Sequence, residues 1–105
     1  MFRAALVAIC CIAVFPTTAF AAGKTHGVRI EGMKFVPERI EVAVGDSITW
    51  VNRDPVPHTV TNAAKSLESG TIAANGKWKY VVRHKGEVDY VCRFHPGMRG
   101  TLTVK

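Results

Sequence analysis

At 105 residues, the chain is long enough for one small domain and too short for two. Its 14 Lys and Arg residues against 8 Asp and Glu give a formal net charge of +6, which favours an anionic partner surface over a cationic one. The basic residues form no dense run with interleaved aromatic residues, so the composition argues against nucleic-acid binding.

Residues 1–21 are typical of a secretion signal rather than of a folded domain. Arg3 supplies a short positive region, residues 4–15 form an apolar run, and residues 19–21 fit the small-x-small rule for cleavage. The apolar run is shorter than the roughly 20 residues that a membrane-spanning helix needs. We therefore expect residues 22–105 to form a periplasmic domain with no membrane span after cleavage, and an uncleaved anchor is the alternative.

Removal of this signal would leave the domain with one cysteine, Cys92, because Cys10 and Cys11 lie in the apolar run. It would also remove Arg3 and leave 13 basic and 8 acidic residues. Secreted proteins usually pair their cysteines, and a single cysteine cannot form an intramolecular disulfide. A metal ligand would explain Cys92, and a free reactive thiol or an inert buried thiol are the alternatives.

Alternating apolar and polar residues, interrupted at short intervals by turn residues, are typical of a β-sandwich or barrel. We therefore expect an all-β domain, an antiparallel Greek-key β-sandwich around one core. The pattern covers residues 28–30, 40–44, 48–52, 78–82, 88–92 and 102–104. The side chains expected in the core are Ile40, Val42, Ile48, Trp50, Val60, Ile72, Tyr80, Val88, Tyr90, Leu102 and Val104.

Turn residues also predict how some of these strands are connected. Gly45 and Asp46 are expected to join residues 40–44 and 48–52 as a hairpin. Residues 63–70 are too short and too polar for a stable helix, and we expect no helix of convincing length in the domain.

Four side chains carry the chemistry of the domain. Two prolines make residues 53–57 a constrained loop rather than a central strand, and this loop leads directly to His58. Cys92 ends a predicted strand, and His95 and Met98 follow it at spacings of three. A loop of that length can fold back so that three side chains converge, and His58 is the best candidate for a fourth ligand.

One thiolate, two imidazoles and one thioether are the ligands of a copper site with a weak axial methionine. A Cys-x2-His pair alone would also suit half of a zinc site, but zinc rarely binds thioether. Covalent haem attachment would require a second cysteine. Core packing could explain Cys92 or Met98 singly.

His26 and His84 are expected to be solvated surface histidines and not ligands.

With these residues, the chain resembles the cupredoxins, the small blue copper proteins, and among them the amicyanin type. The resemblance covers nearly all of the predicted domain. It rests on residues 49–53, Pro57-His58, residues 69–72, the Val88-x-Tyr90-x-Cys92 pattern and residues 95–100. Amicyanins have this short Cys-x2-His-x2-Met loop, whereas plastocyanin and pseudoazurin have two more residues between His and Met.

The resemblance implies one type 1 copper ion, with His58, Cys92 and His95 as strong ligands and Met98 as the axial one. It implies a monomeric electron carrier, not an enzyme, that cycles between Cu(I) and Cu(II). The implied partners are a methylamine dehydrogenase-like donor and a c-type cytochrome acceptor. A copper-trafficking protein, which would use the same ligands, is the alternative, and a copper enzyme would need an open coordination position or a second metal.

Two departures from the family pattern lie beside these ligands. Thr59 stands where these families commonly have Asn, whose side chain ties the two ligand loops together. Arg93 and Phe94 replace the usual Thr-Pro between Cys and His, which places a cation next to the thiolate in sequence. An electron port is expected beside His95, formed by Pro55, Val56, Pro57, Pro96 and Gly97 and rimmed by Arg53, Arg93 and Arg99.

Overall fold

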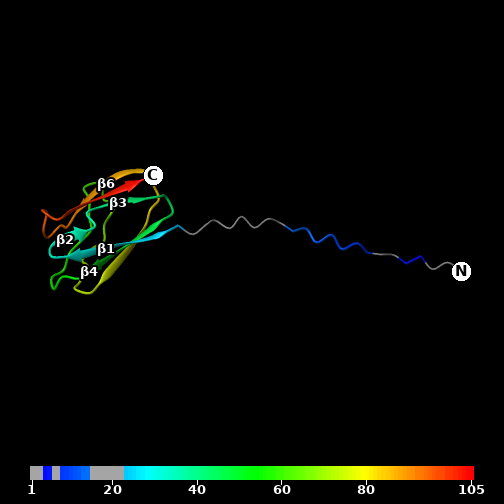
Figure 1. Ribbon diagram of the computed structural model, residues 1–105, viewed down its shortest axis with the longest axis horizontal. Helices are drawn as coiled ribbons and strands as arrows, with labels where there is room; N and C mark the ends of the chain where they lie inside the picture. The colour runs from blue at the N-terminus through cyan, green and yellow to red at the C-terminus, as the bar shows by residue number, and fades with distance from the viewer. Residues whose placement is uncertain (1–3, 6–7, 15–22) are drawn as a thin grey trace.

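The computed structural model describes residues 4–5, 8–14 and 23–105 (Figure 1). Residues 4–5 and 8–14 have no regular secondary structure. Among the described residues, no helix is both long and apolar enough to cross a membrane. The predicted cleavage site at residues 19–21 lies outside the described residues, so the signal and the domain boundary at residue 22 stay predictions.

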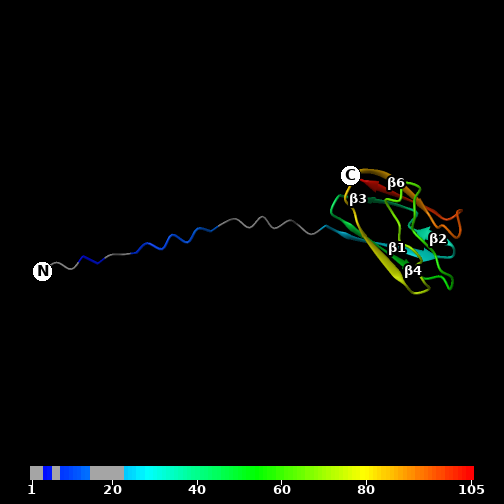
Figure 2. The same ribbon diagram turned by 180° about the vertical axis from the view of Figure 1, so that it is seen from behind.

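Within residues 23–105, strands form two sheets and no helix is present. The strands are β1 (Thr25–Glu31), β2 (Lys34–Val36), β3 (Arg39–Val42), β4 (Ser47–Asn52), β5 (Lys77–Val81), β6 (Gly86–Val91) and β7 (Arg99–Val104). One sheet has the order β2-β1-β4-β5 and the other has the order β3-β7-β6. The start of β1 and the C-terminus lie at one end of the sandwich, and the loop between β6 and β7 lies at its other end (Figures 1 and 2). The all-β prediction is confirmed.

The strand pairing differs from the expected antiparallel pattern. The pairs β1–β4 and β3–β7 are parallel, while β1–β2, β4–β5 and β6–β7 are antiparallel. The predicted hairpin between residues 40–44 and 48–52 is wrong, because β3 and β4 lie in different sheets. Gly45 and Asp46 do make a turn there, with a φ of 95° at Gly45, but this turn carries the chain from one sheet to the other.

The predicted core is confirmed. All the residues expected there are either buried or, for Ile40, Tyr80 and Val88, partly buried against the buried cluster. The core also includes residues outside that expectation: Val28, Ile30, Phe35, Leu67, Val82, Cys92 and Met98. Two of these, Cys92 and Met98, belong to the predicted metal site, so the core continues into that site.

An aromatic cluster joins the two sheets near the end where β6 and β7 meet the metal-site loop. The Trp50 indole N–H donates to the Tyr90 hydroxyl at 3.3 Å, and the edge of one ring faces the other. Burial raises the pKa of Tyr90 to about 12, so its phenol stays protonated. Gly100 lies opposite Tyr90 on β7, where a Cβ would overlap the tyrosine ring. A side chain at position 100 would therefore force the packing around Tyr90 to shift.

Candidate metal centre

The loop that follows β4 is shaped by the buried side chain of Asn52. Its amide nitrogen donates to the carbonyls of Val56 at 2.9 Å and Ile72 at 3.0 Å, and its amide oxygen accepts the Asp54 N–H at 2.9 Å. His58 then pairs with Ile72 through two backbone hydrogen bonds. The proline-rich loop is thus fixed at both ends, and it places His58 in the interior, where its side chain is fully buried.

The other ligand loop is closed by its own backbone. The Cys92 N–H donates to the Met98 carbonyl at 3.2 Å, the His95 N–H to the Cys92 carbonyl at 3.3 Å, and the Met98 N–H to the His95 carbonyl at 2.9 Å. Strands β6 and β7 pair up to Val91 and Arg99 on either side of this loop. Because the loop is short and closed, its three predicted ligands cannot separate widely.

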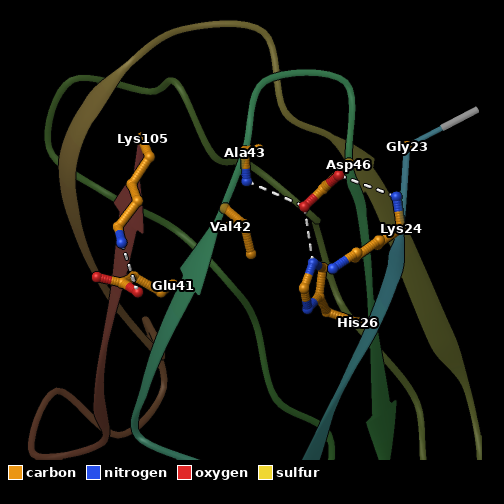
Figure 3. Close-up of a pocket in the computed structure, with 8 residues that line it drawn as sticks. All are labelled: Gly23, Lys24, His26, Glu41, Val42, Ala43, Asp46 and Lys105. Carbon is orange, nitrogen blue, oxygen red and sulfur yellow. Dashed lines mark hydrogen bonds and ion pairs between the residues drawn. The ribbon is translucent and has the colours of Figure 1, made fainter. Parts of the chain in front are cut away.

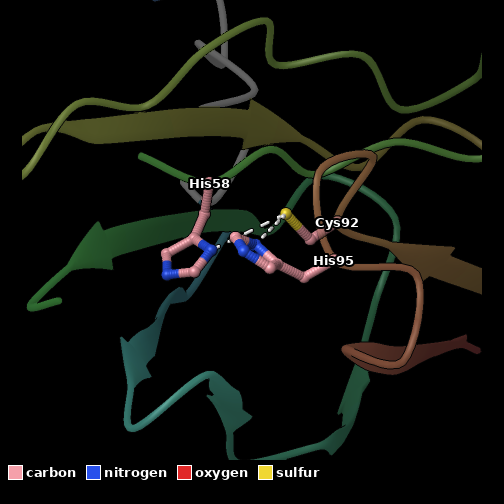
Figure 4. Close-up of side chains that lie close together, drawn as sticks. All are labelled: His58, Cys92 and His95. Carbon is pink, nitrogen blue, oxygen red and sulfur yellow. Dashed lines mark hydrogen bonds between the residues drawn. The ribbon is translucent and has the colours of Figure 1, made fainter. Parts of the chain in front are cut away.

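The two loops bring His58, Cys92 and His95 to one point, with their side chains directed toward one another (Figure 4). The Cys92 Sγ lies 3.6 Å from His58 Nδ1 and 3.9 Å from His95 Nδ1. Metal–sulfur and metal–nitrogen bonds of about 2.3 and 2.0 Å, separated by about 120°, would place S and N about 3.7 Å apart. The two distances therefore suit ligands of one shared metal ion. Met98 is buried in the same loop.

A buried carboxylate that the sequence reasoning missed orients His58. Asp54 Oδ2 lies 2.8 Å from His58 Nε2 and accepts the Met33 N–H, while Oδ1 accepts the Gly32 N–H at 2.7 Å. Burial alone would raise the pKa of Asp54, but the hydrogen bonds from Met33, His58 and Gly32 outweigh it and lower the pKa. The carboxylate therefore keeps the proton of His58 on Nε2 and leaves Nδ1 free for a metal. No spacing signalled this contact, because residues 53–57 were expected to form a loop and the Gly32 and Met33 donors lie about twenty positions from Asp54 in the chain.

Thr59 ties the two ligand loops together. Its backbone N–H points at the Cys92 Sγ at 3.4 Å, and its Oγ1 accepts the Arg93 N–H at 2.8 Å. The Arg93 guanidinium pairs with Glu68 at 3.2 Å, and both side chains are exposed. The positive charge of Arg93 is therefore paired with the carboxylate of Glu68, which lies on the segment after Thr59.

The two other histidines behave differently from each other. His84 is exposed, as expected. His26 is half-buried, and its Nε2 lies 2.8 Å from Asp46 Oδ2, so the prediction of a solvated side chain is wrong for His26 (Figure 3). Asp46 also accepts the N–H groups of Ala43 and Lys24, and these contacts, led by Ala43 and His26, lower its pKa to about 2. This cluster lies at the C-terminal end of β7, away from the metal-site loop.

Residues 3–104 match the model of the cupredoxin-like domain. The chain belongs to this family. Amicyanin-alpha of Methylorubrum extorquens is 30% identical over 115 residues, and the match covers 99% of this cupredoxin and 96% of that protein. Amicyanin of Paracoccus denitrificans is 32% identical over 83 residues, with 74% of this chain covered. The match covers 63% of that relative, so this chain spans less than two-thirds of its length.

Solved structures agree with this assignment. The Cu(I) structure of a methionine-to-alanine mutant of amicyanin has a TM-score of 0.71 and 30% identity, over 77% of this chain and 82% of that one. A purple cupredoxin from Nitrosopumilus maritimus has the same fold, with a TM-score of 0.68 at 24% identity over 76% of this chain. The resemblance that the sequence motifs predicted, and the cupredoxin fold, are confirmed.

Proposed function

We propose that this cupredoxin is an electron carrier that holds one copper ion and passes single electrons between redox proteins. The observation that supports this most directly is the convergence of Cys92 Sγ with the two Nδ1 atoms of His58 and His95, at distances that suit one metal ion. A thiolate with two imidazoles favours copper among the transition metals when a thioether completes the set. Copper bound there supplies the one-electron change between Cu(I) and Cu(II).

The residues of the chain have distinct roles in this proposal. His58, Cys92 and His95 would hold the copper ion through two imidazole nitrogens and a thiolate, and Met98 would add a thioether from the loop that carries Cys92 and His95. Asp54 holds His58 in the tautomer that binds through Nδ1. The closed loop and the surrounding sandwich keep the ligands in nearly one geometry in both oxidation states, which is what rapid electron transfer requires.

Burial of the ligands favours electron transfer over copper trafficking. His58 and Cys92 are both 0% exposed, so a chelating partner could not approach either of them without displacing part of the protein. A trafficking protein needs accessible ligands that can be exchanged one at a time. His95 is the partly exposed ligand, and we assign it the path by which electrons enter and leave.

The surface around His95 suits a redox protein as a partner. Pro55, Val56, Pro57, Pro96 and Gly97 are all exposed on the loops that carry His58 and His95, and Phe94 adds an exposed aromatic ring. Arg53 and Arg99 are exposed and form no ion pair among the described residues. We therefore propose an apolar port with a cationic rim that docks an anionic face of the partner.

Compartment and partners follow from the family resemblance and the amino-terminal sequence. Residues 1–21 would direct the chain to the periplasm, where residues 22–105 would act as a monomer. The likeness to amicyanins favours a methylamine dehydrogenase-like donor and a c-type cytochrome acceptor.

The test of the proposed function is the spectrum of the copper-loaded protein. We expect an intense absorption near ~600 nm and a small copper hyperfine splitting in EPR, with one copper per chain. Cys92→Ser should abolish the absorption, whereas His84→Ala, at an exposed histidine outside the site, should keep it. A colourless copper complex of the wild-type protein would refute the proposal.

A further inference from the structure

Two buried hydroxyl groups follow His58 and are not accounted for by the ligand set. Thr59 and Thr61 are 3% and 5% exposed, and their Oγ1 atoms lie 3.3 Å apart. Thr61 pairs with Val91, the residue before Cys92, through two backbone hydrogen bonds of 3.0 and 2.8 Å. Thr59 contacts Arg93, the residue after Cys92. The two threonines therefore contact the residues on either side of Cys92 in the chain.

The hydrogen-bond partners fix the direction in which each hydroxyl donates. The Thr61 Oγ1 lies 3.1 Å from the Val91 carbonyl, which can only accept, so the single hydroxyl proton of Thr61 points there. Thr61 must then accept from Thr59 across the 3.3 Å contact. Thr59 in turn accepts the Arg93 N–H at 2.8 Å. Every proton is used once, in the order Arg93 N–H, Thr59 O–H, Thr61 O–H and Val91 carbonyl.

We propose that Thr59 and Thr61 are positioning residues whose two hydroxyls form a relay that holds both peptide units flanking Cys92. The relay bridges from the N–H that follows Cys92 to the carbonyl that precedes it. It therefore limits rotation of the Cys92 backbone and sets where Sγ lies relative to His58 Nδ1. Its redox consequence rests on the proposed copper site, but the relay itself is a property of the folded chain.

The relay also acts on the sulfur through the backbone of Thr59. The Thr59 N–H points at Sγ at 3.4 Å, and a hydrogen bond to a thiolate favours the more electron-rich, reduced state of a metal site. If the hydroxyl of Thr59 no longer anchors Arg93, the loop can move away from Thr59 and this contact lengthens. Loss of the relay should therefore lower the reduction potential.

The first experiment measures amide hydrogen exchange at Arg93 in the copper-free protein. Thr59→Val keeps the shape of the side chain and removes the hydroxyl, and we expect the Arg93 amide to exchange about tenfold faster, as loss of one hydrogen bond predicts. Thr61→Val should accelerate it less, because Thr59 can still accept. Thr59→Ser should restore slow exchange. The matched control is Thr71→Val, at an exposed threonine whose side chain makes no hydrogen bond to the residues described.

The second experiment measures the reduction potential of the copper-loaded variants. We expect Thr59→Val to lower it by up to about 59 mV, a tenfold change in the ratio of Cu(II) to Cu(I) affinity, and Thr59→Ser to stay near wild type. Unchanged exchange and potential in Thr59→Val, or a Thr59→Ser variant that behaves like Thr59→Val, would overturn the proposal. If Thr59→Val does not fold, faster Arg93 exchange in Thr61→Val than in Thr71→Val decides the question. Absence of the blue absorption in the copper-loaded wild-type protein would refute the copper site. The relay would then be tested by amide hydrogen exchange at Arg93 alone.

Discussion

Replacement of Asp54 by Asn tests whether a buried carboxylate sets the geometry of His58, the proposed metal ligand. Three donors meet the two oxygens of Asp54: the Gly32 N–H on Oδ1, and the Met33 N–H and His58 Nε2 on Oδ2. An amide has one acceptor oxygen, so at least one buried donor loses its partner, at a cost of about 1–3 kcal/mol of unfolding free energy.

The orientation of the amide that Asp54→Asn introduces decides what happens to copper binding. With its oxygen toward His58, the tautomer is kept but the acceptor is uncharged, and the Gly32 N–H is left unpaired. With its nitrogen toward His58, the amide donates to Nε2, so the proton moves to Nδ1 and blocks the metal. Changes in residues that orient a ligand typically cost about 10–100-fold in metal affinity, and we expect Asp54→Asn to fall in this range.

Asp46 provides a matched control at the other end of the sandwich. It has the same three kinds of donor: a backbone N–H on Oδ1, and a second backbone N–H with a histidine Nε2 on Oδ2. Urea denaturation of the copper-free proteins should show that Asp46→Asn and Asp54→Asn lose similar stability. Copper titration against a competing chelator should show weaker binding in Asp54→Asn alone. Equal copper affinities in the two variants would refute the role assigned to Asp54.

Three further predictions concern the packing, the surface and the charges. Gly100→Ala should lower the unfolding free energy by about 1–3 kcal/mol in urea denaturation, because its methyl group overlaps the Tyr90 ring and the core must shift. Val56→Asp should slow electron transfer to a c-type cytochrome by about tenfold and keep the blue absorption. Val44→Asp, at an exposed valine in the turn before Asp46, should leave both the rate and the absorption unchanged. Equal transfer rates in the two variants would exclude the port. Because the pKa of Asp46 is lowered from 3.8 to about 2, its contribution to stability is complete above pH 3.8 and is lost as the pH falls toward 2. In the copper-free protein, the difference in unfolding free energy between wild type and Asp46→Asn should therefore shrink as the pH falls through that window.

The convergence of the proposed ligands could be predicted because most of them are local. Cys92, His95 and Met98 lie within one short loop, so their spacing almost determines that they converge. His58 could be added because a proline-stiffened loop ends at it. The structure brings His58, Cys92 and His95 together and buries Met98 beside them. Local spacing carries this information because a short loop closed by its own hydrogen bonds has few conformations.

The sheet assignment of the strands could not be predicted in the same way. Residues 40–44 and 48–52 have the alternation and the turn residues of a hairpin, yet β3 pairs with β7 and β4 pairs with β1. A turn at Gly45 and Asp46 is compatible with both a hairpin and a crossing between sheets. Whether a hairpin or a crossing forms depends on which distant strands have a free edge for pairing. The alternation of apolar and polar residues along the chain carries no information about those edges.

The two buried carboxylates show why hydrogen bonds that orient histidines could not be predicted from the sequence. Asp54 and Asp46 look like ordinary turn residues, and the donors that bury them come from residues about twenty positions away. His26 was expected to be solvated for the same reason, because its partner Asp46 is brought beside it only by the pairing of β1 with β4. Such contacts exist only after the sheets have formed.

Both carboxylates act on the same pair of parallel strands. Asp46 precedes β4 and accepts the N–H of Lys24, which precedes β1, while Asp54 follows β4 and accepts the N–H groups of Gly32 and Met33, which follow β1. Parallel neighbours cannot be joined by a tight turn, so their register depends on contacts of this kind at each end. At one end the histidine on the carboxylate is His26, and at the other it is His58. The proposed copper ligand His58 therefore occupies a position that the fold already requires to be rigid. The stability of the β1–β4 pair and the geometry of the proposed metal centre both depend on one side chain, Asp54.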